Sequence, residues 1–283
     1  MDRFGGGKAE RGYMRARLRV VAVVAVIFLC AGMFPSCSLR GEVSIIIAGS
    51  TSVQPYVEVV MEEFGHLNPD IKIDIQGGGS SAGITAVISN TADIGMSSRS
   101  LKDSEQHLWS VEIAKDGLAV IINPGNPVEN ISLEQIRGIY AAEIVNWSEL
   151  GGPNAKIHII TREEGSGTRS AFEELVMAGR RISPRAIVQD SNGAVRQLVS
   201  DDVNSIGFIS LGLVEIGEKP VKPLKLDGVI ASRGNVINGS YSLYRPFLFI
   251  SGSRPEGAVS QFIDFILSTE GQHILSVEGL IPE

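Results

Sequence analysis

Short apolar runs alternate along the chain with segments whose apolar residues recur every three or four positions. The run at 43–48 is almost continuously apolar, as expected of a strand that is covered on both faces. The next segment, 53–64, carries its apolar residues with helical spacing. Isoleucine alternates with polar residues at 71–75, and a buried strand is expected at 206–209. Strands that alternate with helices in this way predict an α/β fold with mostly parallel sheets.

The second half of the pattern predicts how the chain divides. A strand is expected at 118–123, and the loop Pro-Gly-Asn-Pro at 124–127 follows it directly. We therefore place a boundary between two lobes there, and we expect 244–250 to be the strand that returns the chain. The sequence also predicts three more helices, at 101–110, 131–140 and 257–275.

One stretch changes from strand to helix within a few residues. The apolar run at 157–160 leads through Arg162 into Gly-Ser-Gly-Thr at 165–168, and a helix follows, with a possible capping box between Ser170 and Glu173. The unpaired N–H groups at a helix N-terminus attract anions, and an arginine offers a planar fork of donors that suits an oxyanion. The stretch predicts half of an oxyanion clamp, although a helix capped by its own serine and threonine remains the alternative.

The same design of strand, small-residue turn and helix occurs three times. The turns begin at Gly49, Gly77 and Gly165, while Ser98 and Arg162 stand at strand ends. Ligands of parallel sheets bind beyond the carboxyl ends of the strands. We therefore expect several helix N-termini to converge on one small anion.

Two other motifs overlap the second turn. Gly77, Gly79 and Ala82 have the spacing of a dinucleotide fingerprint, but the acidic residue Asp93 comes too soon after them. Gly79 and Ser81 also start a Gly-x-Ser-x-Gly nucleophile elbow. A secreted serine hydrolase with Ser81 as its nucleophile therefore stays open.

For this hydrolase, His158 or His273 would supply the base, but only one strand precedes the strand of the elbow, too few for a hydrolase sheet in its usual order. A phosphate-binding P-loop would need a lysine after Gly167. The spacing of cysteine and histidine does not predict a metal site, and we expect no cofactor.

Composition and charge limit the partners. The chain has 283 residues, enough for two domains, and a formal net charge of −7. The first 37 residues hold six of its 25 basic residues and only two of its 32 acidic ones, so the remainder is more acidic still. An acidic surface is unsuited to nucleic acid, which we exclude as a partner.

The N-terminus predicts export. A basic stretch that ends at Arg19 precedes the apolar run 20–29, which is shorter than a membrane-spanning helix. Phe-Pro-Ser-Cys at 34–37 resembles a bacterial lipoprotein signal, with phenylalanine where leucine is usual. On this interpretation 1–37 is a signal peptide that ends at the lipidated Cys37, and an uncleaved membrane anchor is the alternative. Either way, the folded part lies outside the cytoplasmic membrane.

In these features the chain resembles the phosphate-binding proteins of phosphate ABC transporters. The resemblance covers nearly all of the chain after Cys37, and the motifs occur in the family's order. They are Gly49-Ser50-Thr51-Ser52 with Pro55, Gly79-Ser80-Ser81 with Gly83, Asp93-Ile94-Gly95, 139–147, Arg162 with Gly165-Ser166-Gly167-Thr168, and Asn238-Gly239 with Tyr241.

The resemblance implies a two-lobed periplasmic-binding-protein-like fold in which each lobe is a mostly parallel sheet flanked by helices. Residues 43–121 and 247–283 would form lobe one, 122–246 would form lobe two, and crossing strands would join them. The chain would bind inorganic phosphate in the cleft and deliver it to permease subunits. We expect a monomer that performs no catalysis. It would be lipid-anchored at the outer face of the cytoplasmic membrane or in the periplasm.

The resemblance also implies a set of phosphate-binding residues, with Glu164 steadying the arginine. The set is Thr51, Ser52, Ser80, Ser98, Arg162, Ser166, Gly167 and Thr168. Many family members carry an aspartate at the position of Ser98, where it accepts the hydrogen bond of the phosphate proton. Ser98 and the neighbouring Arg99 therefore leave sulfate or molybdate open as ligands.

Overall fold

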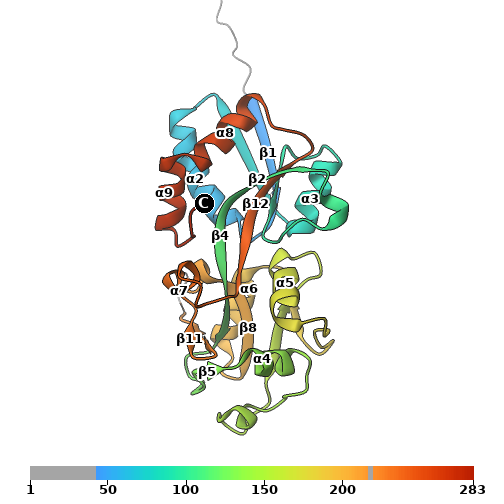
Figure 1. Cartoon of the computed structure of the whole chain (residues 1–283), viewed down its shortest axis with the longest axis vertical. Helices are drawn as coiled ribbons and strands as arrows, with labels where there is room; N and C mark the ends of the chain where they lie inside the picture. The colour runs from blue at the N-terminus through green and yellow to red at the C-terminus, as the bar shows by residue number, and fades with distance from the viewer. Residues whose placement is uncertain (1–42, 216–218) are drawn as a thin grey trace, which may run out of the picture. The chain divides into compact units, whose positions relative to one another are not determined.

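The computed structural model describes residues 43–215 and 219–283, which belong to one compact unit (Figure 1). The predicted signal peptide 1–37, including Cys37, lies outside the described residues. The helices are α2 (Gln54–Leu67), α3 (Ser80–Ile88), α4 (Leu133–Tyr140), α5 (Gly167–Phe172), α6 (Asn192–Asp201), α7 (Arg233–Ile237), α8 (Gly257–Leu267) and α9 (Thr269–Val277). The strands are β1 (Val43–Gly49), β2 (Ile71–Gly77), β3 (Ile94–Ser97), β4 (Trp109–Ile122), β5 (Asn130–Ile131), β6 (His158–Arg162), β7 (Ile187–Gln189), β8 (Ser205–Ser210), β9 (Lys222–Pro223), β10 (Lys225–Leu226), β11 (Val229–Ile230) and β12 (Tyr244–Ser251).

Nine strands of the described residues form one sheet, and its two ends are parallel. On one side β1 pairs with β2 and β3 in parallel; on the other, β6 pairs in parallel with β7 and β8. Between them lie β12 and β4, which pair antiparallel with each other and with their outer neighbours β3 and β8. Both strands run from one half into the other (Figure 1). The predicted α/β class and the crossing strands are confirmed.

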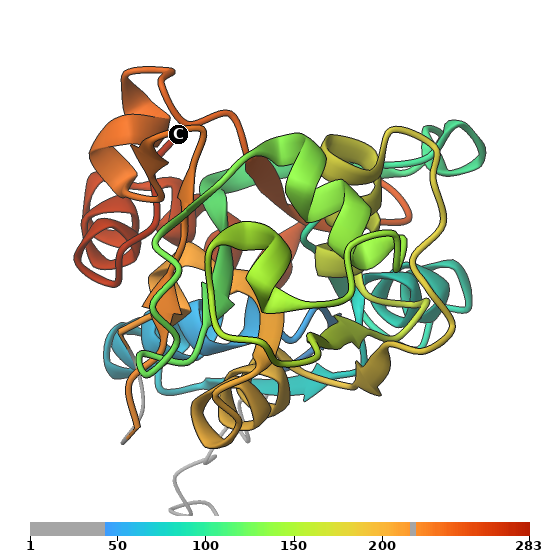
Figure 2. The same ribbon diagram turned by 90° about the horizontal axis from the view of Figure 1, so that it is seen from below.

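The two halves bury separate hydrophobic cores. The core of one half includes Phe64, Phe249 and Phe262, all almost fully buried. In the other half, Phe172 and Phe208 stack with ring centroids 4.0 Å apart. Buried aromatic pairs add to the area that each core removes from water. Helices α4, α5 and α6 all contribute buried residues to the second core, and α4 lies toward the viewer when the molecule is seen from below (Figure 2).

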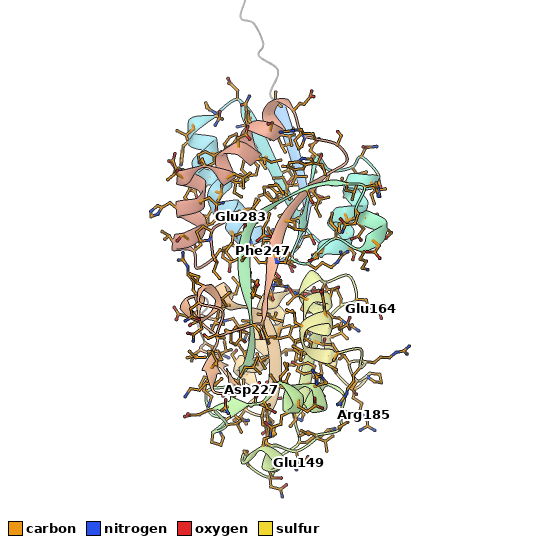
Figure 3. All side chains as sticks on the ribbon, viewed as in Figure 1. Glu149, Glu164, Arg185, Asp227, Phe247 and Glu283 are labelled. Carbon is orange, nitrogen blue, oxygen red and sulfur yellow. The ribbon has the colours of Figure 1, made fainter. Side chains whose placement is uncertain are left out.

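The crossing strands pass from one core to the other. Leu118, near the end of β4, already packs in the core around Phe172, whereas Phe247 on β12 belongs to the core around Phe64 (Figure 3). The division into 43–121 with 247–283 and 122–246 is compatible with this arrangement and stays a prediction.

Two element predictions are wrong. The helix expected at 101–110 is a single short helical turn, Asp103–Glu105, because β4 begins at Trp109 and extends the strand expected at 118–123. The helix expected at 257–275 is divided into α8 and α9 at Ser268. This residue is extended, with φ −67° and ψ 165°, and its hydroxyl accepts the backbone N–H of Gly271. Serine favours such an N-cap over a helix interior.

None of the helices in 43–215 and 219–283 has both the length and the apolar character that are needed to cross a bilayer.

Candidate functional site

Three turns meet at the ends of β1, β2 and β6, and glycines allow their close approach. Gly49 has φ +137°, and a Cβ there would lie 2.3 Å from the carbonyl oxygen of Met96. Gly79 has φ +88°, and its N–H donates to the Gly49 carbonyl over 2.9 Å. L-residues with a side chain rarely adopt these angles. The first two turns are therefore fixed to each other, and the Ser81 N–H donates to the Gly165 carbonyl of the third turn over 3.1 Å.

Five buried hydroxyl groups gather where the turns meet, and we call them the hydroxyl cluster. They are Ser50, Ser52, Ser80, Ser98 and Thr168, each at most 2% exposed. The Ser52 and Thr168 oxygens are 2.7 Å apart, and the Ser50 hydroxyl donates to the Ser98 oxygen over 2.9 Å. The Ser98 N–H donates to the Ser80 hydroxyl over 3.0 Å. Thr168 comes from one half of the molecule and the four serines from the other.

Arg162 lies beside the cluster at the end of β6, with 1% of its surface exposed. Its Nη2 donates to the Thr51 hydroxyl over 3.2 Å and to the Asp190 carbonyl over 2.9 Å. Its Nη1 is buried and has no hydrogen-bond partner among the described residues. A buried donor without an acceptor costs free energy, so this nitrogen is a candidate to bind an anion.

The carboxylate that holds Arg162 is not the one expected. Glu163 accepts from Nε over 3.0 Å and from Nη2 over 2.9 Å, which makes a bidentate pair. Glu164 is exposed, and Figure 3 shows it at the outer side of α5. The prediction that Glu164 steadies the arginine is therefore wrong. The turn that follows β6 directs the first acid back along the guanidinium and the second toward solvent.

The N-terminus of α5 adds further donors. Ser166 caps it: the Ser166 hydroxyl accepts the N–H of Arg169 over 3.3 Å. The predicted capping box between Ser170 and Glu173 is wrong, because the Ser170 hydroxyl donates back to the Ser166 carbonyl and Glu173 accepts from the Arg169 guanidinium. A capped helix leaves its first N–H groups without partners inside the helix. For α5 these belong to Gly167 and the next residue.

Gly167 lies so near the serines of the other half that a side chain has no room there. A Cβ at this position would lie 2.2 Å from the Ser80 hydroxyl and 2.5 Å from that of Ser98. The structure thus brings together the predicted residues of all three turns and of the end of β3. Their role as ligand-binding residues stays a proposal.

The sequence analysis missed a buried ion pair beneath the cluster. Arg245 on β12 donates to Asp116 on β4 over 3.0 and 3.1 Å, and both are at most 2% exposed. Burial raises the pKa of Asp116 and lowers that of Arg245, and each charge opposes the other's shift. Arg245 also donates to the Ser98 carbonyl over 3.4 Å, and the Ser210 hydroxyl donates to Asp116 over 2.7 Å.

Two neutral members of the site were also missed, Ser50 and Asn192. Asn192 opens α6, and its Nδ2 donates to the Ser52 hydroxyl over 2.6 Å. The segment Ser191-Asn192-Gly193 follows the short strand β7 and begins a helix, so it has the same small-residue design as the three turns. That signal was available from the sequence, whereas the pairing of positions 116 and 245 was not.

Arg99 does not turn toward the cluster. Its guanidinium donates to the Glu105 carboxylate over 2.7 and 2.9 Å, and only 4% of the Arg99 side chain is exposed. Its charge is therefore balanced by Glu105, outside the cluster.

The nucleophile elbow has no catalytic partner in the part of the chain that the structure describes. His158, one candidate base, is 2.6 Å from Asp202, and the Ser81 side chain makes no hydrogen bond to a histidine. Across 43–215 and 219–283, His, Cys, Asp and Glu form no group of three or more that could hold a metal ion. What the site offers chemically is a set of neutral and cationic hydrogen-bond donors.

Comparison with known proteins places the chain in a family. Residues 38–270 match a PBP superfamily domain. The phosphate-binding protein PstS of Bacillus subtilis is 30% identical over 256 residues, which cover 87% of this chain and 84% of the relative. The PstS protein of Borreliella burgdorferi is 29% identical over 271 residues, 92% of this chain and 97% of the relative.

Solved structures agree with these sequence matches. A crystal structure with bound phosphate, assigned to a phosphate ABC transporter substrate-binding protein of Clostridium perfringens, has 43% identity and a TM-score of 0.81, covering 85% of this chain and 99% of that chain. An ABC-type phosphate transport receptor of Vibrio cholerae has 36% identity and a TM-score of 0.71, covering 84% and 100%. The two-lobed fold expected from the sequence is thus confirmed. The chain therefore belongs to the PBP superfamily and, within it, to the family of PstS phosphate-binding proteins.

Proposed function

We propose that this chain is the substrate-binding component of a phosphate ABC transporter, which captures inorganic phosphate in the cleft and delivers it to the permease. The observation that carries the proposal is the buried Nη1 of Arg162, which has no partner among the described residues and belongs to a side chain beside five buried hydroxyls. A tetrahedral oxyanion supplies several acceptors at once, and guanidinium groups bind such oxyanions through charge-assisted hydrogen bonds.

Each side of the cleft contributes donors to the phosphate. Thr51, Ser52, Ser80 and Ser98 bind from one lobe. From the other lobe come Arg162, Ser166, Gly167 and Thr168. Gly167 and Thr168 use the free N–H groups at the start of α5, while the Ser166 hydroxyl caps the helix and still has its own proton to donate.

The proposed protein binds and releases its ligand without chemical change. Donors stabilise an anion, but hydrolysis would also need a base beside Ser81, and none of the described histidines forms a hydrogen bond with its side chain. Relatives are named as binding proteins and a transport receptor, which supports the same conclusion. Phosphate should be recovered intact, and a Ser81-dependent esterase activity would overturn this part of the proposal.

Calorimetric titration of the purified protein with phosphate, sulfate and molybdate tests the function directly. We expect one phosphate to bind per chain, more tightly than either of the other two anions. Stronger binding of sulfate or molybdate would identify another oxyanion as the ligand. The absence of binding by all three would overturn the proposal.

We also propose that 1–37 directs export and that Cys37 carries a lipid anchor, so that a monomer works at the outer face of the membrane or in the periplasm. The support is the sequence pattern alone: a basic stretch, a short apolar run and the serine before the cysteine. Cys37→Ser should move the protein from the membrane fraction to the soluble fraction. An unchanged distribution would point to an uncleaved membrane anchor instead.

A further inference from the structure

Asn192 connects the two lobes through the hydroxyl cluster. It is the first residue of α6, only 1% exposed, and its Nδ2 donates to the Ser52 hydroxyl over 2.6 Å. Its Oδ1 accepts the backbone N–H of Ser210 over 3.3 Å. A backbone N–H can only donate, so it requires the amide oxygen on that side. The amide nitrogen must therefore face Ser52, and this side chain cannot accept a proton from it.

This fixed donor determines how the neighbouring hydroxyls use their protons. Ser52 accepts from Asn192 and lies 2.7 Å from the Thr168 hydroxyl. The two hydroxyls have two protons between them, and their mutual hydrogen bond uses one. The other proton has no acceptor among the described residues and must be donated to whatever binds in the cleft.

We propose that Asn192 is a positioning residue of the anion site, which makes Ser52 and Thr168 a pair that donates to the ligand. The inference rests on the proposed function and extends it. It assigns to α6 a role in selecting ligands whose oxygen atoms accept hydrogen bonds. If an acceptor replaced the Asn192 amide nitrogen, the Ser52 hydroxyl would donate its hydrogen bond to that acceptor. The Thr168 hydroxyl would then donate to the Ser52 oxygen. No hydroxyl proton would remain for the anion.

Replacing Asn192 by aspartate therefore tests the proposal, because the two side chains have almost the same volume and differ in the group that faces Ser52. In Asn192→Asp the carboxylate takes the place of the donor and also repels the anion, so phosphate affinity should fall by about 100-fold or more. Asn192→Ala removes the donor without adding an acceptor, and affinity should fall by only about tenfold. A residue that merely filled space would give the reverse order, because alanine leaves the larger defect.

Asn126 provides the matched control. It is also fully buried, its Nδ2 donates to the Val203 carbonyl and its Oδ1 accepts the Val128 N–H, but it contacts no member of the hydroxyl cluster. Asn126→Asp should therefore introduce the same buried charge and leave phosphate affinity within about threefold of wild type. A loss as large as in Asn192→Asp would show a general effect of a buried acid and overturn the inference.

A double-mutant cycle covers the case in which the aspartate variant does not fold. Ser52→Ala removes the hydroxyl to which Asn192 donates and adds no bulk to the side chain. In that background Asn192→Ala should cost less than about threefold in phosphate affinity, compared with about tenfold alone. An equal loss in both backgrounds would contradict the proposal. Wild-type protein that binds no phosphate would instead contradict the proposed function itself.

Discussion

At the scale of single residues, the charge of the buried Arg162 is balanced by Glu163, but its hydrogen-bond donors are not all used. The three N–H donors on its Nε and Nη2 are divided between Glu163, two carbonyls and Thr51, and the two on Nη1 lack a partner among the described residues. The carboxylate keeps a buried cation tolerable when no anion is bound. In the proposed function, Nη1 gains an acceptor when the anion binds.

Arg162→Ala should weaken phosphate binding by at least about tenfold, since one charge-assisted hydrogen bond contributes roughly 1.5–3 kcal/mol. Arg162→Lys should recover only part of the affinity, because an ammonium group lacks the planar fork. Titration calorimetry measures both. Arg180, which pairs with Glu134 and Glu143 on the surface, provides the control variant Arg180→Ala. Equal affinities of wild type and Arg162→Ala would place the ligand elsewhere.

Ser98 should determine how well phosphate is distinguished from sulfate. Near neutral pH the two ions differ mainly in that phosphate keeps a proton, which a buried carboxylate would accept while repelling sulfate. Ser98 is neutral, so we expect a preference for phosphate with a smaller margin than in relatives that carry the aspartate.

Ser98→Asp should widen this margin and lower the affinity for both ions at high pH. Competition titrations with phosphate and sulfate compare the two proteins. If wild type ignores a thousandfold excess of sulfate (on the order of 4 kcal/mol of discrimination) and the variant behaves identically, the assignment of Ser98 is wrong.

The Arg99–Glu105 pair should stabilise the fold in a pH-dependent way. Hydrogen bonds from Arg99 lower the pKa of Glu105 below its ordinary value of 4.5. The stabilisation is therefore complete above pH 4.5 and is lost as the pH falls below it through the depressed pKa. At pH 7, Glu105→Gln should reduce the free energy of unfolding by roughly 1.5–3 kcal/mol.

Urea unfolding of wild type and Glu105→Gln at several pH values measures this difference, which should shrink in acid. Glu62→Gln, at an exposed position of α2, is the control and should be near neutral throughout. A difference that stays constant down to pH 3 would mean that the ion pair is not its source.

At the scale of elements, α5 approaches the serine turns so closely that its first residue has no room for a side chain. A Cβ added at Gly167 would collide with the hydroxyls of Ser80 and Ser98. A Cβ added at Gly165, two residues earlier, would meet only the Cβ of Ser81, at 4.0 Å. The N-terminus of the helix is thus held against the hydroxyl cluster by the smallest residue. Both substitutions by alanine reduce the flexibility of the chain, but only the one at Gly167 also places a Cβ against the hydroxyl cluster. Comparing them therefore isolates the effect of the close approach.

Gly167→Ala should weaken phosphate binding by more than about tenfold, because a Cβ within 2.5 Å of two hydroxyl oxygens forces the lobes apart. Gly165→Ala, the matched control, should bind with nearly wild-type affinity. Titration calorimetry compares them, and thermal unfolding checks that both variants fold. Similar affinities for the two variants would contradict the docking of α5 on the cluster.

At the scale of the whole described unit, two cores are joined by β4 and β12 and also by polar contacts between the lobes. One is the hydrogen bond from Ser81 to the Gly165 carbonyl, and another joins Arg233 of α7 to Ser276 of α9. Such contacts are polar, whereas each core is packed from buried apolar side chains. Motion of the lobes about the crossing strands therefore costs less than deformation of either core.

Saturating phosphate should reduce the radius of gyration measured by small-angle X-ray scattering, because a ligand that binds both lobes favours the closed arrangement by its differential affinity. Gly167→Ala should show a smaller reduction at the same phosphate concentration. Identical scattering profiles with and without bound phosphate would argue against closure, although not against binding.

The sequence by itself determined the class of fold, and it predicted which turns would form a site. Periodicity is a local property, so it gave the strands and helices wherever the pattern was long enough; it failed at 101–110 and at Ser268, where strand pairing and a cap competed with helical spacing. The turns at Gly49 and Gly77 also pointed to one site, because the parallel strands β1 and β2 end at a common edge. The turn at Gly165 meets them for another reason: β6 lies in the other half and runs in the opposite direction, so that its carboxyl end faces theirs.

Only the tertiary structure decided which groups meet there. Glu163 and Glu164 are neighbours of the same type, and the path of the turn alone selects the first as the partner of Arg162. Asp116 pairs with Arg245 across 129 positions, and Asn192 reaches Ser52 across 140. Contacts at such separations depend on how the elements pack, and local propensity carries no information about them.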